Sequence, residues 1–582
     1  KYIQEVLNHL PAYEFHYLKK VIGLAGRDFF ILKSGEKYVF RYDLIAEYFL
    51  SQFMKRDDFD EIVKEFLPYM PFRISYNILM IPRFFIPPRS FGEEAARKAV
   101  QNFREELKKV VQTLSEIWEE LNKIEGQTPE YFSALILFTG DLSPFFDIEK
   151  IDIHHWLRCY EKVSKDYSEK GVREELAGSL CNAAKSYSEA SMLEKMETCL
   201  KELRKLHMKY EDKEVREKLA KALVNATIGY GEAGKLEEIE ACLGELRELH
   251  LRYPEKEIRE ELAIGLLNAT NYYGRRNKLN KMEDSLKELR ELHTKYRERE
   301  VREELAGGLF NAARYYGVEG GLEKMEAFLK ELRELHMKYG EREVREYLAK
   351  SLVNATDSYG RAYMFEEMEA CPKELIELHK KHKEKEVREN LARGLYNAMT
   401  IYGKVGKLDR MENYIRKLEE LHKEYPEREI REELAKALVN ATSYYGRRDK
   451  IVEMEVCLKD LRAPHIKHPE KEVREKLAKG LVNATNHYGR AERFDKMEAC
   501  LKELKALHKD HPEKEVREEL AKGLFNAIYH YGRRDKIVEM EACLKELREL
   551  YLNHPEKEVR EALDKGLFYM RIYRRRLLQL GG

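Results

Sequence analysis

The stretch "LAKGLVNATNHYGRA", residues 477–491, decides the fold because nearly the same phrase returns at a fixed distance along the chain. "LAKALVNATSYYGRR" occupies residues 434–448, and "LAKSLVNATDSYGRA" occupies residues 348–362. The asparagine of this phrase recurs every 43 residues, at Asn182, Asn225, Asn268, Asn311, Asn354, Asn397, Asn440, Asn483 and Asn526, and Tyr569 stands at the tenth position. A fixed period of this size is typical of stacked supersecondary units.

Each repeat carries two apolar stripes with helical spacing. We number positions within a repeat from the asparagine, which is position 0. One stripe runs through −10, −6, −5, −2, +1 and +5, and a second runs through +11, +14, +18, +21 and +24. Gly at +6, as in Gly274 and Gly446, is expected to end the first helix, and Pro at +29, as in Pro254, follows the second. One unit is therefore predicted to be two antiparallel helices of roughly 17–19 residues, which bury both stripes only by stacking.

Charge and composition exclude several classes of partner. The 106 Lys and Arg residues balance 106 Asp and Glu residues, which gives no general attraction to nucleic acid or to anionic membranes. The sequence contains no apolar run of about 18 residues, so we predict no membrane-spanning helix. No secretory signal precedes the first helix. We therefore expect a cytoplasmic protein with no membrane partner and no specific nucleic-acid partner.

Two further features concern the origin of the chain. It begins at Lys1 and not at Met, so we expect it to be a piece of a longer protein. Gln is scarce beside abundant Glu, Lys and Arg, which indicates a thermophilic source.

Two columns of the repeat contain residue types that can bind metals. Six of the eight cysteines share position +17, where other repeats carry Ser285, Phe328 and Tyr414, so we interpret it as a packing position in a protein of a reducing compartment. These six are Cys199, Cys242, Cys371, Cys457, Cys500 and Cys543. A histidine column at +25 places neighbouring rings about one helix diameter apart, which is too far for one ion. We predict no metal and no cofactor within these residues.

Charged columns recur as regularly as the apolar ones. Arg at −9 and Glu at −8 occur in every repeat from Arg173 to Arg560, and Glu at +15 occurs in the repeats with a second helix. The helical wheel places all three columns at the surface. We expect them to form ion pairs that link neighbouring repeats, each worth about 0.5 kcal/mol.

The repeat resembles the tetratricopeptide family. The first helix of that family reads Leu-Gly-x-x-Tyr near its middle, then Gly, a turn, and a second helix that contains Ala, and "LLNATNYYGRRNKLNKME" (266–283) is similar. The period of 43 exceeds the usual period of about 34 residues, so each helix would be about a turn longer. The resemblance implies an all-α, right-handed α-solenoid over 171–582, with nine full repeats and a C-terminal capping helix. Residues 91–170 are predicted to be a helical connector whose part 128–170 is a degenerate capping repeat.

A candidate binding face surrounds the asparagine column. Positions −4, +4 and +7 lie on the same side of the helix and supply basic and aromatic groups. The basic residues at −4 are Lys221, Lys350, Arg393, Lys436, Lys479 and Lys522. The rings at +4 are Tyr272, Tyr315, Tyr444, His487 and His530, and the arginines at +7 are Arg275, Arg361, Arg447, Arg490 and Arg533.

In tetratricopeptide proteins the equivalent face lines the concave groove, where a Lys and an Asn one turn apart hold a peptide's carboxylate or backbone. The resemblance implies that these residues, with the asparagines from Asn225 to Asn526, bind a protein or peptide. An Asn amide offers donors and an acceptor together, which matches a peptide bond. The alternative is that each Asn makes an interhelical hydrogen bond that fixes the packing of repeats, and both interpretations remain open.

Residues 1–90 do not repeat. "FFILKSGEKYVFRY" (29–42) alternates and turns at Ser-Gly, which predicts a β-hairpin, and "DLIAEYFLSQF" (43–53) predicts a helix. Together they suggest a winged-helix-like α/β element before a linker at 81–90. "YVFRYDLIAEYF" resembles the end of the nucleotide-binding module of STAND NTPases, the signalling class with NACHT or NB-ARC domains. Tyr42 stands where that class commonly has a His that contacts ADP.

Three functional hypotheses follow. The resemblance implies the sensor region of a STAND NTPase; in the prokaryotic antiviral branch the trigger is a phage protein, and nucleotide-driven oligomerisation activates an effector. The parent protein would then bind ATP and Mg²⁺, but these residues contain no Gly-x-x-x-x-Gly-Lys-Ser/Thr loop. The second hypothesis is a tetratricopeptide-like scaffold with no NTPase. The third, an enzyme within the solenoid, has no catalytic residue set behind it, so we expect no catalysis.

Overall fold

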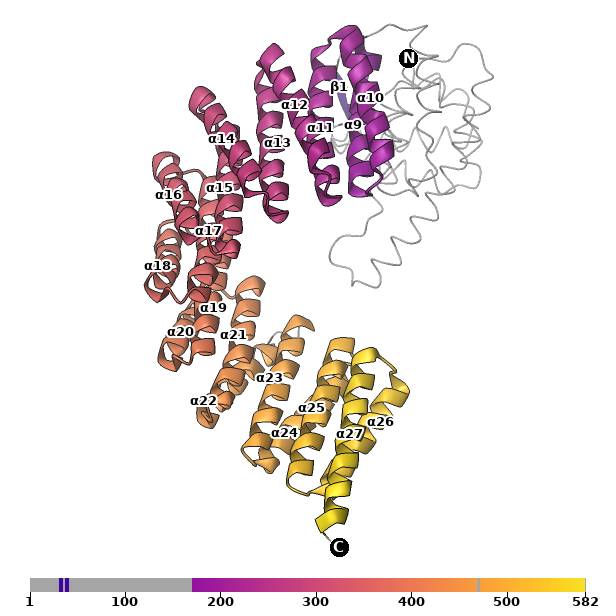
Figure 1. The fold of residues 1–582 in the computed structure, drawn as a ribbon, viewed down its shortest axis with the longest axis vertical. Coiled ribbons are helices and arrows are strands. Elements are labelled where there is room, and N and C mark those ends of the chain that lie inside the picture. Colours follow the sequence, from indigo (N-terminus) through magenta and orange to yellow (C-terminus); the bar gives the residue numbers. More distant parts are fainter. Residues whose placement is uncertain (1–30, 35–36, 41–169, 468–470, 581–582) are drawn as a thin grey trace, which may run out of the picture. The chain divides into compact units, whose positions relative to one another are not determined.

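The computed structural model describes residues 31–34, 37–40, 170–467 and 471–580 (Figure 1). Each repeat consists of a first and a second helix. The first helices are α9 (Lys170–Glu189), α11 (Lys213–Glu232), α13 (Lys256–Arg275), α15 (Arg299–Glu319), α17 (Arg342–Arg361), α19 (Lys385–Val405), α21 (Arg428–Arg447), α23 (Lys471–Arg490), α25 (Lys514–Arg533) and α27 (Lys557–Leu580). The second helices are α10 (Leu193–Tyr210), α12 (Leu236–Arg252), α14 (Leu279–Tyr296), α16 (Leu322–Tyr339), α18 (Phe365–Lys381), α20 (Leu408–Glu424), α22 (Ile451–Lys467), α24 (Phe494–Asp510) and α26 (Ile537–Asn553).

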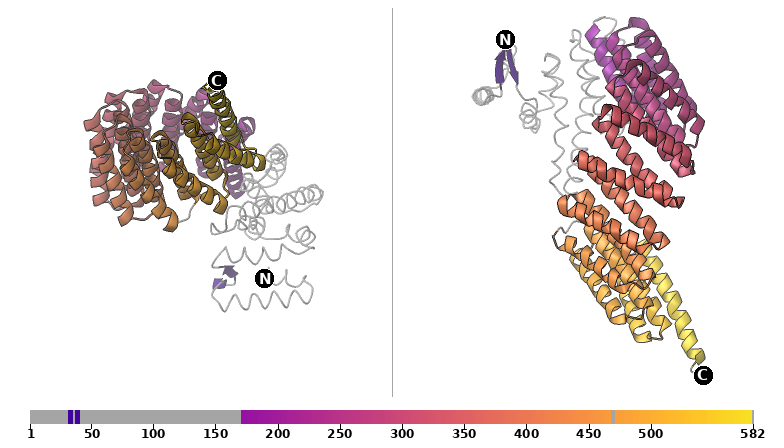
Figure 2. Two further views of the ribbon diagram at one scale, coloured as in Figure 1. Left: turned by 90° about the horizontal axis from the view of Figure 1, so that it is seen from below. Right: turned by 90° about the vertical axis from the view of Figure 1, so that its left-hand side faces the viewer.

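The predicted helical solenoid of two-helix repeats is confirmed. The chain divides into two compact units, Lys1–Arg276 and Asn277–Gly582. Within each unit, first helices pack side by side, for example α9 against α11 and α23 against α25, and each also packs against the second helix that follows it. Figures 1 and 2 show this stacking of helical pairs in the second unit. The handedness of the solenoid and the tetratricopeptide subtype of the repeat stay predictions.

The core follows the two predicted stripes. Ala263, Leu266 and Ala269 of α13 are fully buried. The small Ala side chains allow the neighbouring first helix to approach closely. Met282 and Leu289 of α14 are fully buried in the same way. Each buried Leu or Met contributes about 1.5–3 kcal/mol of transfer free energy, so stacking supplies the stability that one helical pair lacks. The seven described cysteines are buried and free, as the packing interpretation predicts.

The end of the first helix differs from the prediction. The first helices before α27 have 20 or 21 residues, because α21, for example, continues through Gly446 to Arg447. The residue with positive φ lies at position +9 instead, as in Gly406 (φ 84°) and Asp449 (φ 57°). The expectation that Gly at +6 ends the helix was therefore wrong, and this glycine needs another explanation.

The front of the chain is described only at the hairpin. β1 (Ile31–Ser34) pairs antiparallel with β2 (Lys37–Phe40), and Ser34 lies opposite Lys37. This confirms the β-hairpin predicted at 29–42. The helix expected at 43–53 and the connector expected at 91–170 fall outside the described residues apart from Lys170. The winged-helix-like element therefore stays a prediction.

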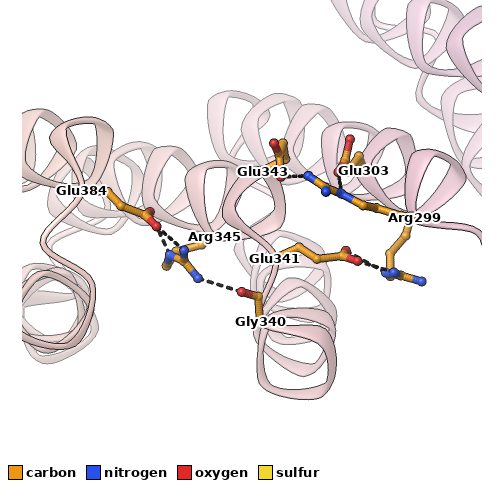
Figure 3. A network of polar contacts seen from close by, with 8 residues as sticks. Arg299, Glu303, Gly340, Glu341, Glu343, Arg345 and Glu384 are labelled. Atoms are coloured by element: carbon orange, nitrogen blue, oxygen red, sulfur yellow. Dashed lines mark hydrogen bonds and ion pairs between the residues drawn. The ribbon is translucent and has the colours of Figure 1, made fainter.

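The arginine at −9 is buried in the repeats from α11 to α25, which corrects its predicted exposure, whereas Arg560 of α27 is exposed as predicted. Arg345 is only 5% exposed. Its Nε donates to Glu384 at 3.0 Å, and its Nη1 donates to the carbonyl oxygen of Gly340 at 2.9 Å (Figure 3). Gly340 caps the C-terminus of α16, and Glu384 precedes the first residue of α19. One guanidinium therefore holds together two successive turns between repeats, where the helical wheel alone suggested a solvated side chain.

Some of these guanidinium groups also stack on a tyrosine ring. The guanidinium of Arg302 lies 3.8 Å from the ring centroid of Tyr339, and that of Arg216 lies 3.8 Å from the ring centroid of Tyr253. A planar guanidinium can stack on a ring and donate in its own plane at the same time, which Lys cannot do. This geometry favours Arg over Lys where a tyrosine lies against the guanidinium, as at Arg216, Arg302 and Arg388.

Replacing Arg345 with Met is expected to lower the free energy of unfolding by about 2 kcal/mol, because hydrogen bonds to a charged group are lost. Glu384 retains a side-chain exposure of 29%, so water can solvate it after the change, which keeps the loss moderate. Chemical denaturation measures the effect. Arg416→Met is the matched control, since that guanidinium is 63% exposed and pairs with Glu412 only at 3.5 Å. Equal losses in the two variants would contradict a special role for position −9.

Glutamate at +15 links neighbouring repeats, but its partner is a hydroxyl as well as a cation. Tyr359 Oη donates to Glu326 at 2.6 Å, and Tyr402 Oη donates to Glu369 at 2.6 Å. In each pair the tyrosine stands at +5 of the repeat that follows the glutamate. Arg333 Nη1 also donates to Glu326 at 2.6 Å within the same helix. The predicted ion pairs between repeats occur at this position, as between Arg410 and Glu369 at 3.4 Å, and a tyrosine–carboxylate hydrogen bond accompanies them.

The histidine column at +25 packs edge-on against rings of the next repeat. The centroids of His207 and Tyr253 are 5.7 Å apart, and those of His379 and Tyr425 are 5.3 Å apart. Within the described ranges, no three His, Cys, Asp or Glu side chains gather closely enough to hold a metal ion. Among the helices α9–α27, none combines the length and the hydropathy that a membrane crossing needs.

Candidate protein-binding surface

Positions −4, 0, +3 and +7 of the first helices lie on one side of the helix, away from the apolar stripe, and we call them the first-helix strip. The basic residues predicted at −4 belong to this strip, because their side chains point away from the apolar stripe of the helix. Arg393, Lys479 and Lys522 are exposed, as is Lys221, while Lys350 and Lys436 are half-buried.

Most cations at −4 are paired within their own helix. Lys350 pairs with Glu346 at 2.8 Å, and Arg393 approaches Glu389 at 3.9 Å. In the later repeats Lys436 pairs with Glu433 and Lys522 with Glu519, both at 2.8 Å. These pairs are three or four residues apart, a spacing that the sequence shows directly. The positive charge of the −4 column is therefore largely balanced by carboxylates of the same helices.

The asparagines at position 0 are half-buried between neighbouring first helices, and Asn311 is only 7% exposed. Asn268 Nδ2 donates to Thr227 Oγ1 at 3.0 Å. Asn397 Nδ2 donates to the carbonyl oxygen of Val353 at 3.3 Å, and Asn440 Nδ2 donates to Tyr396 Oη at 3.0 Å. In every case the acceptor belongs to the preceding repeat. These bonds support the packing interpretation of the column, while binding through its remaining polar atoms stays a prediction.

The rings at +4 are buried, which differs from their expected place on an open face. Tyr272, His487 and His530 are 5% exposed, and Tyr315 and Tyr444 are 8% exposed. On the helical wheel +4 lies about 40° from the asparagine toward the apolar stripe, whereas −4, +3 and +7 lie on its other side. Position +4 therefore lies outside the first-helix strip, and a direct contact of these rings with a partner stays untested.

These rings explain the glycine at +6. A Cβ on Gly403 would lie 2.2 Å from the ring of Tyr444, and a Cβ on Gly446 would lie 2.3 Å from the ring of His487. A Cβ on Gly231 would lie 2.3 Å from Tyr272. Each glycine therefore leaves room for a ring of the next repeat to lie on its backbone. The sequence contained this signal as the joint recurrence of +4 rings and +6 glycines.

The arginines at +7 are the most exposed cations of the strip. Arg275 pairs with Glu232 of the preceding repeat at 2.7 Å, and Arg361 pairs with Asp357 at 3.1 Å. Arg447, Arg490 and Arg533 are exposed too, and no ion pair joins them to a carboxylate within the described part of the chain. The balance of charge therefore changes along the array, from paired to unpaired cations.

An alanine test separates the two interpretations of the asparagine column. Changing Asn440, Asn483 and Asn526 together to Ala is expected to cost about 1–3 kcal/mol of folding stability, because buried partners lose their hydrogen bonds. Changing Lys436, Lys479 and Lys522 to Ala is the matched variant in the same repeats, and we expect it to leave melting nearly unchanged. Thermal melting with partner affinity measures both. An Asn variant that melts like the parent chain but loses its partner would make the column a binding element only.

Comparisons with known proteins support the fold alone. No protein-family model and no curated protein sequence matches the chain. A crystal structure of importin-β in polyethylene glycol is similar, with a TM-score of 0.52 and 11% identity over 98% of this chain and 77% of that one. Yeast importin-β (Kap95p) is similar with a TM-score of 0.56 and 12% identity, over 91% of this chain and 65% of that one. The chain therefore has a helical-repeat solenoid fold like that of importin-β.

Proposed function

We propose that the first-helix strip binds a protein, and that the repeat array is the ligand-sensing region of a STAND NTPase. The observation that supports protein binding is the recurrence of one polar pattern on successive first helices. From α17 to α25, each repeat presents a cation at −4, an amide at 0 and a cation at +7. A surface that repeats in register suits a partner that extends across several repeats.

The sensor role rests on the resemblance of residues 38–49 to the end of a STAND nucleotide-binding module. In this proposal ATP and Mg²⁺ are bound by other parts of the parent protein, which oligomerises when a trigger occupies the array. A phage protein is the trigger if the protein belongs to the antiviral branch, and the site of action is then the cytoplasm. A scaffold that joins partner proteins is the second candidate, and the solenoid fold favours it equally.

A photo-crosslinking residue at Ser443 tests protein binding, because Ser443 is half-exposed at position +3 of the first-helix strip. The same residue at Lys459, exposed on α22, is the matched control. The full chain is illuminated in extracts of cells with and without phage infection. We expect discrete protein adducts from the Ser443 position and few from the Lys459 position. Equal yields from both positions, or none from Ser443, would refute the assigned surface.

A second measurement distinguishes a sensor from a scaffold. ATP hydrolysis by the parent protein is followed with and without the crosslinked partner. We expect the partner to raise the rate if the array is a sensor. No hydrolysis in either condition would leave the scaffold as the function.

A further inference from the structure

Five cations at +7 form a continuous row on the first helices of the C-terminal repeats. We call it the basic row: Lys404, Arg447, Arg490, Arg533 and Arg576, on α19, α21, α23, α25 and α27. All five side chains are exposed. Within the described residues no carboxylate pairs with any of them, in contrast to Arg361 one repeat earlier, which pairs with Asp357.

Two buried histidines lie close to the basic row. The rings of His487 and His530 are 5% exposed, and His487 Nδ1 is buried without a hydrogen-bond partner in the described chain. Burial, and then the positive charges of Arg447 and Arg490, lower the pKa of His487 to about 4. Burial and the charges of Arg533, His487 and Arg490 lower the pKa of His530 to about 4 as well. The row therefore places exposed cations above neutral rings, and no carboxylate of the described residues forms an ion pair with them.

We propose that the basic row docks an acidic polypeptide segment of the partner, laid across the first helices from α19 to α27. This inference rests on the proposed protein-binding function and names the class of partner. Neighbouring packed helices lie about 8–10 Å apart, so consecutive cations of the row have a similar spacing. An extended chain advances about 3.3 Å per residue, so about every third residue meets the next cation and about a dozen residues span the row.

A peptide fits the surroundings better than a nucleic acid does. The half-buried asparagine column runs beside the row and can pair with a peptide backbone. The glutamates at −8, such as Glu432, Glu475 and Glu518, are partly exposed on the same helices, and each pairs with a cation four residues earlier at 2.9–3.8 Å. Their charges are therefore balanced, and the amide column is the feature that favours a peptide.

The test uses oligo-glutamate peptides as probes of the full chain. Binding of a fluorescent 14-residue probe, about the length of the row, is compared by anisotropy with that of a 6-residue probe, and with oligo-lysine and oligo-thymidine of 14 units. The variant R447Q/R490Q/R533Q removes three cations of the row. The control K459Q/K502Q/K545Q removes three exposed lysines from the second helices of the same repeats.

We expect the parent chain to bind the 14-residue oligo-glutamate more tightly than the 6-residue one. The row variant should bind the 14-residue probe about 30-fold more weakly than the parent chain does, because three exposed ion pairs are lost together. The control variant should bind like the parent chain, and added salt should weaken binding. If the triple variant does not fold, R490Q alone should still weaken binding by about threefold.

Other outcomes would overturn the inference. Unchanged binding by the row variant, with earlier melting, would mean that the row only stabilises helix C-termini. Tighter binding of oligo-thymidine, lost in the same variant, would make the row a nucleic-acid surface. Protein adducts at Ser443 that persist in the row variant would keep the protein-binding function but remove its acidic partner class. The absence of those adducts in the parent chain would refute the function itself.

Discussion

Acidification from pH 7.5 to pH 4.5 is expected to destabilise the repeat array by several kcal/mol. Burial lowers the pKa of histidines in the +25 column, and with the charges of Arg345 and neighbouring cations it lowers that of His336 to about 4. His487 and His530 also have a pKa of about 4. Because the unfolded chain takes up these protons near pH 6.5, the stabilisation is complete above that pH and is lost as the pH falls toward 4.

Thermal melting at constant ionic strength, measured between pH 7.5 and pH 4.5, checks this expectation. Arg345 lowers the pKa of the Glu384 carboxyl below its ordinary value, so the stability that this pair contributes is lost mainly below the window. Burial raises the pKa of Glu261 and Glu419, and their protonation on acidification opposes the loss.

The chain itself suggests the control. Tyr272 and Tyr444 occupy the same position as His487 and His530, so His487→Tyr with His530→Tyr should fit on the glycines below. We expect this variant to lose less stability at pH 4.5 than the parent chain. An unchanged dependence of melting temperature on pH would show that these two rings do not carry the effect.

Replacing Gly403 with Ala is expected to cost about 3 kcal/mol, at the upper end for overpacking, although Ala is the better helix former. The new Cβ would lie 2.2 Å from the ring of Tyr444, which is 8% exposed and has little room to move. Chemical denaturation measures the loss.

Gly244→Ala is the matched control in the middle of α12. No atom outside its own helix lies within 4 Å of a Cβ there, so the same substitution should stabilise the chain by about 0.5–1 kcal/mol. If both substitutions stabilise, position +6 does not depend on close approach of the ring.

The sequence predicts the repeat well because its signal is local. Apolar stripes of period 3 and 4 depend only on one helix, and the hairpin at Ile31–Phe40 depends on alternation and a turn, so both are confirmed. Contacts between repeats are less visible, since they depend on how far one helix is offset from the next. Arg345 is polar on a wheel drawn for one helix, yet the turn that ends at Glu384 covers it.

The candidate surface was predictable in outline and not in its charge balance. The wheel correctly placed Lys436 and Arg447 on the outer side of the asparagine column. The wheel does not show that Lys436 forms an ion pair with Glu433, whereas Arg447 forms none with a carboxylate of the described residues. Such pairing depends on the rotamers of long side chains and on the neighbouring repeat. The basic row can therefore be identified only once the side-chain rotamers and the neighbouring repeat are known.

The contacts between repeats join residues at constant separations along the sequence, so the chain can gain or lose whole repeats. The arginine–glutamate bonds of Arg302 and Arg345 both join residues 39 apart, and the tyrosine–glutamate bonds of Tyr359 and Tyr402 both join residues 33 apart. One unit can therefore follow any other without a new interface. Unequal recombination between near-identical copies, such as those at 434–448 and 477–491, can add or remove a unit in one step. The reach of the basic row would then vary between descendants by whole repeats, while the stability of each junction stays the same.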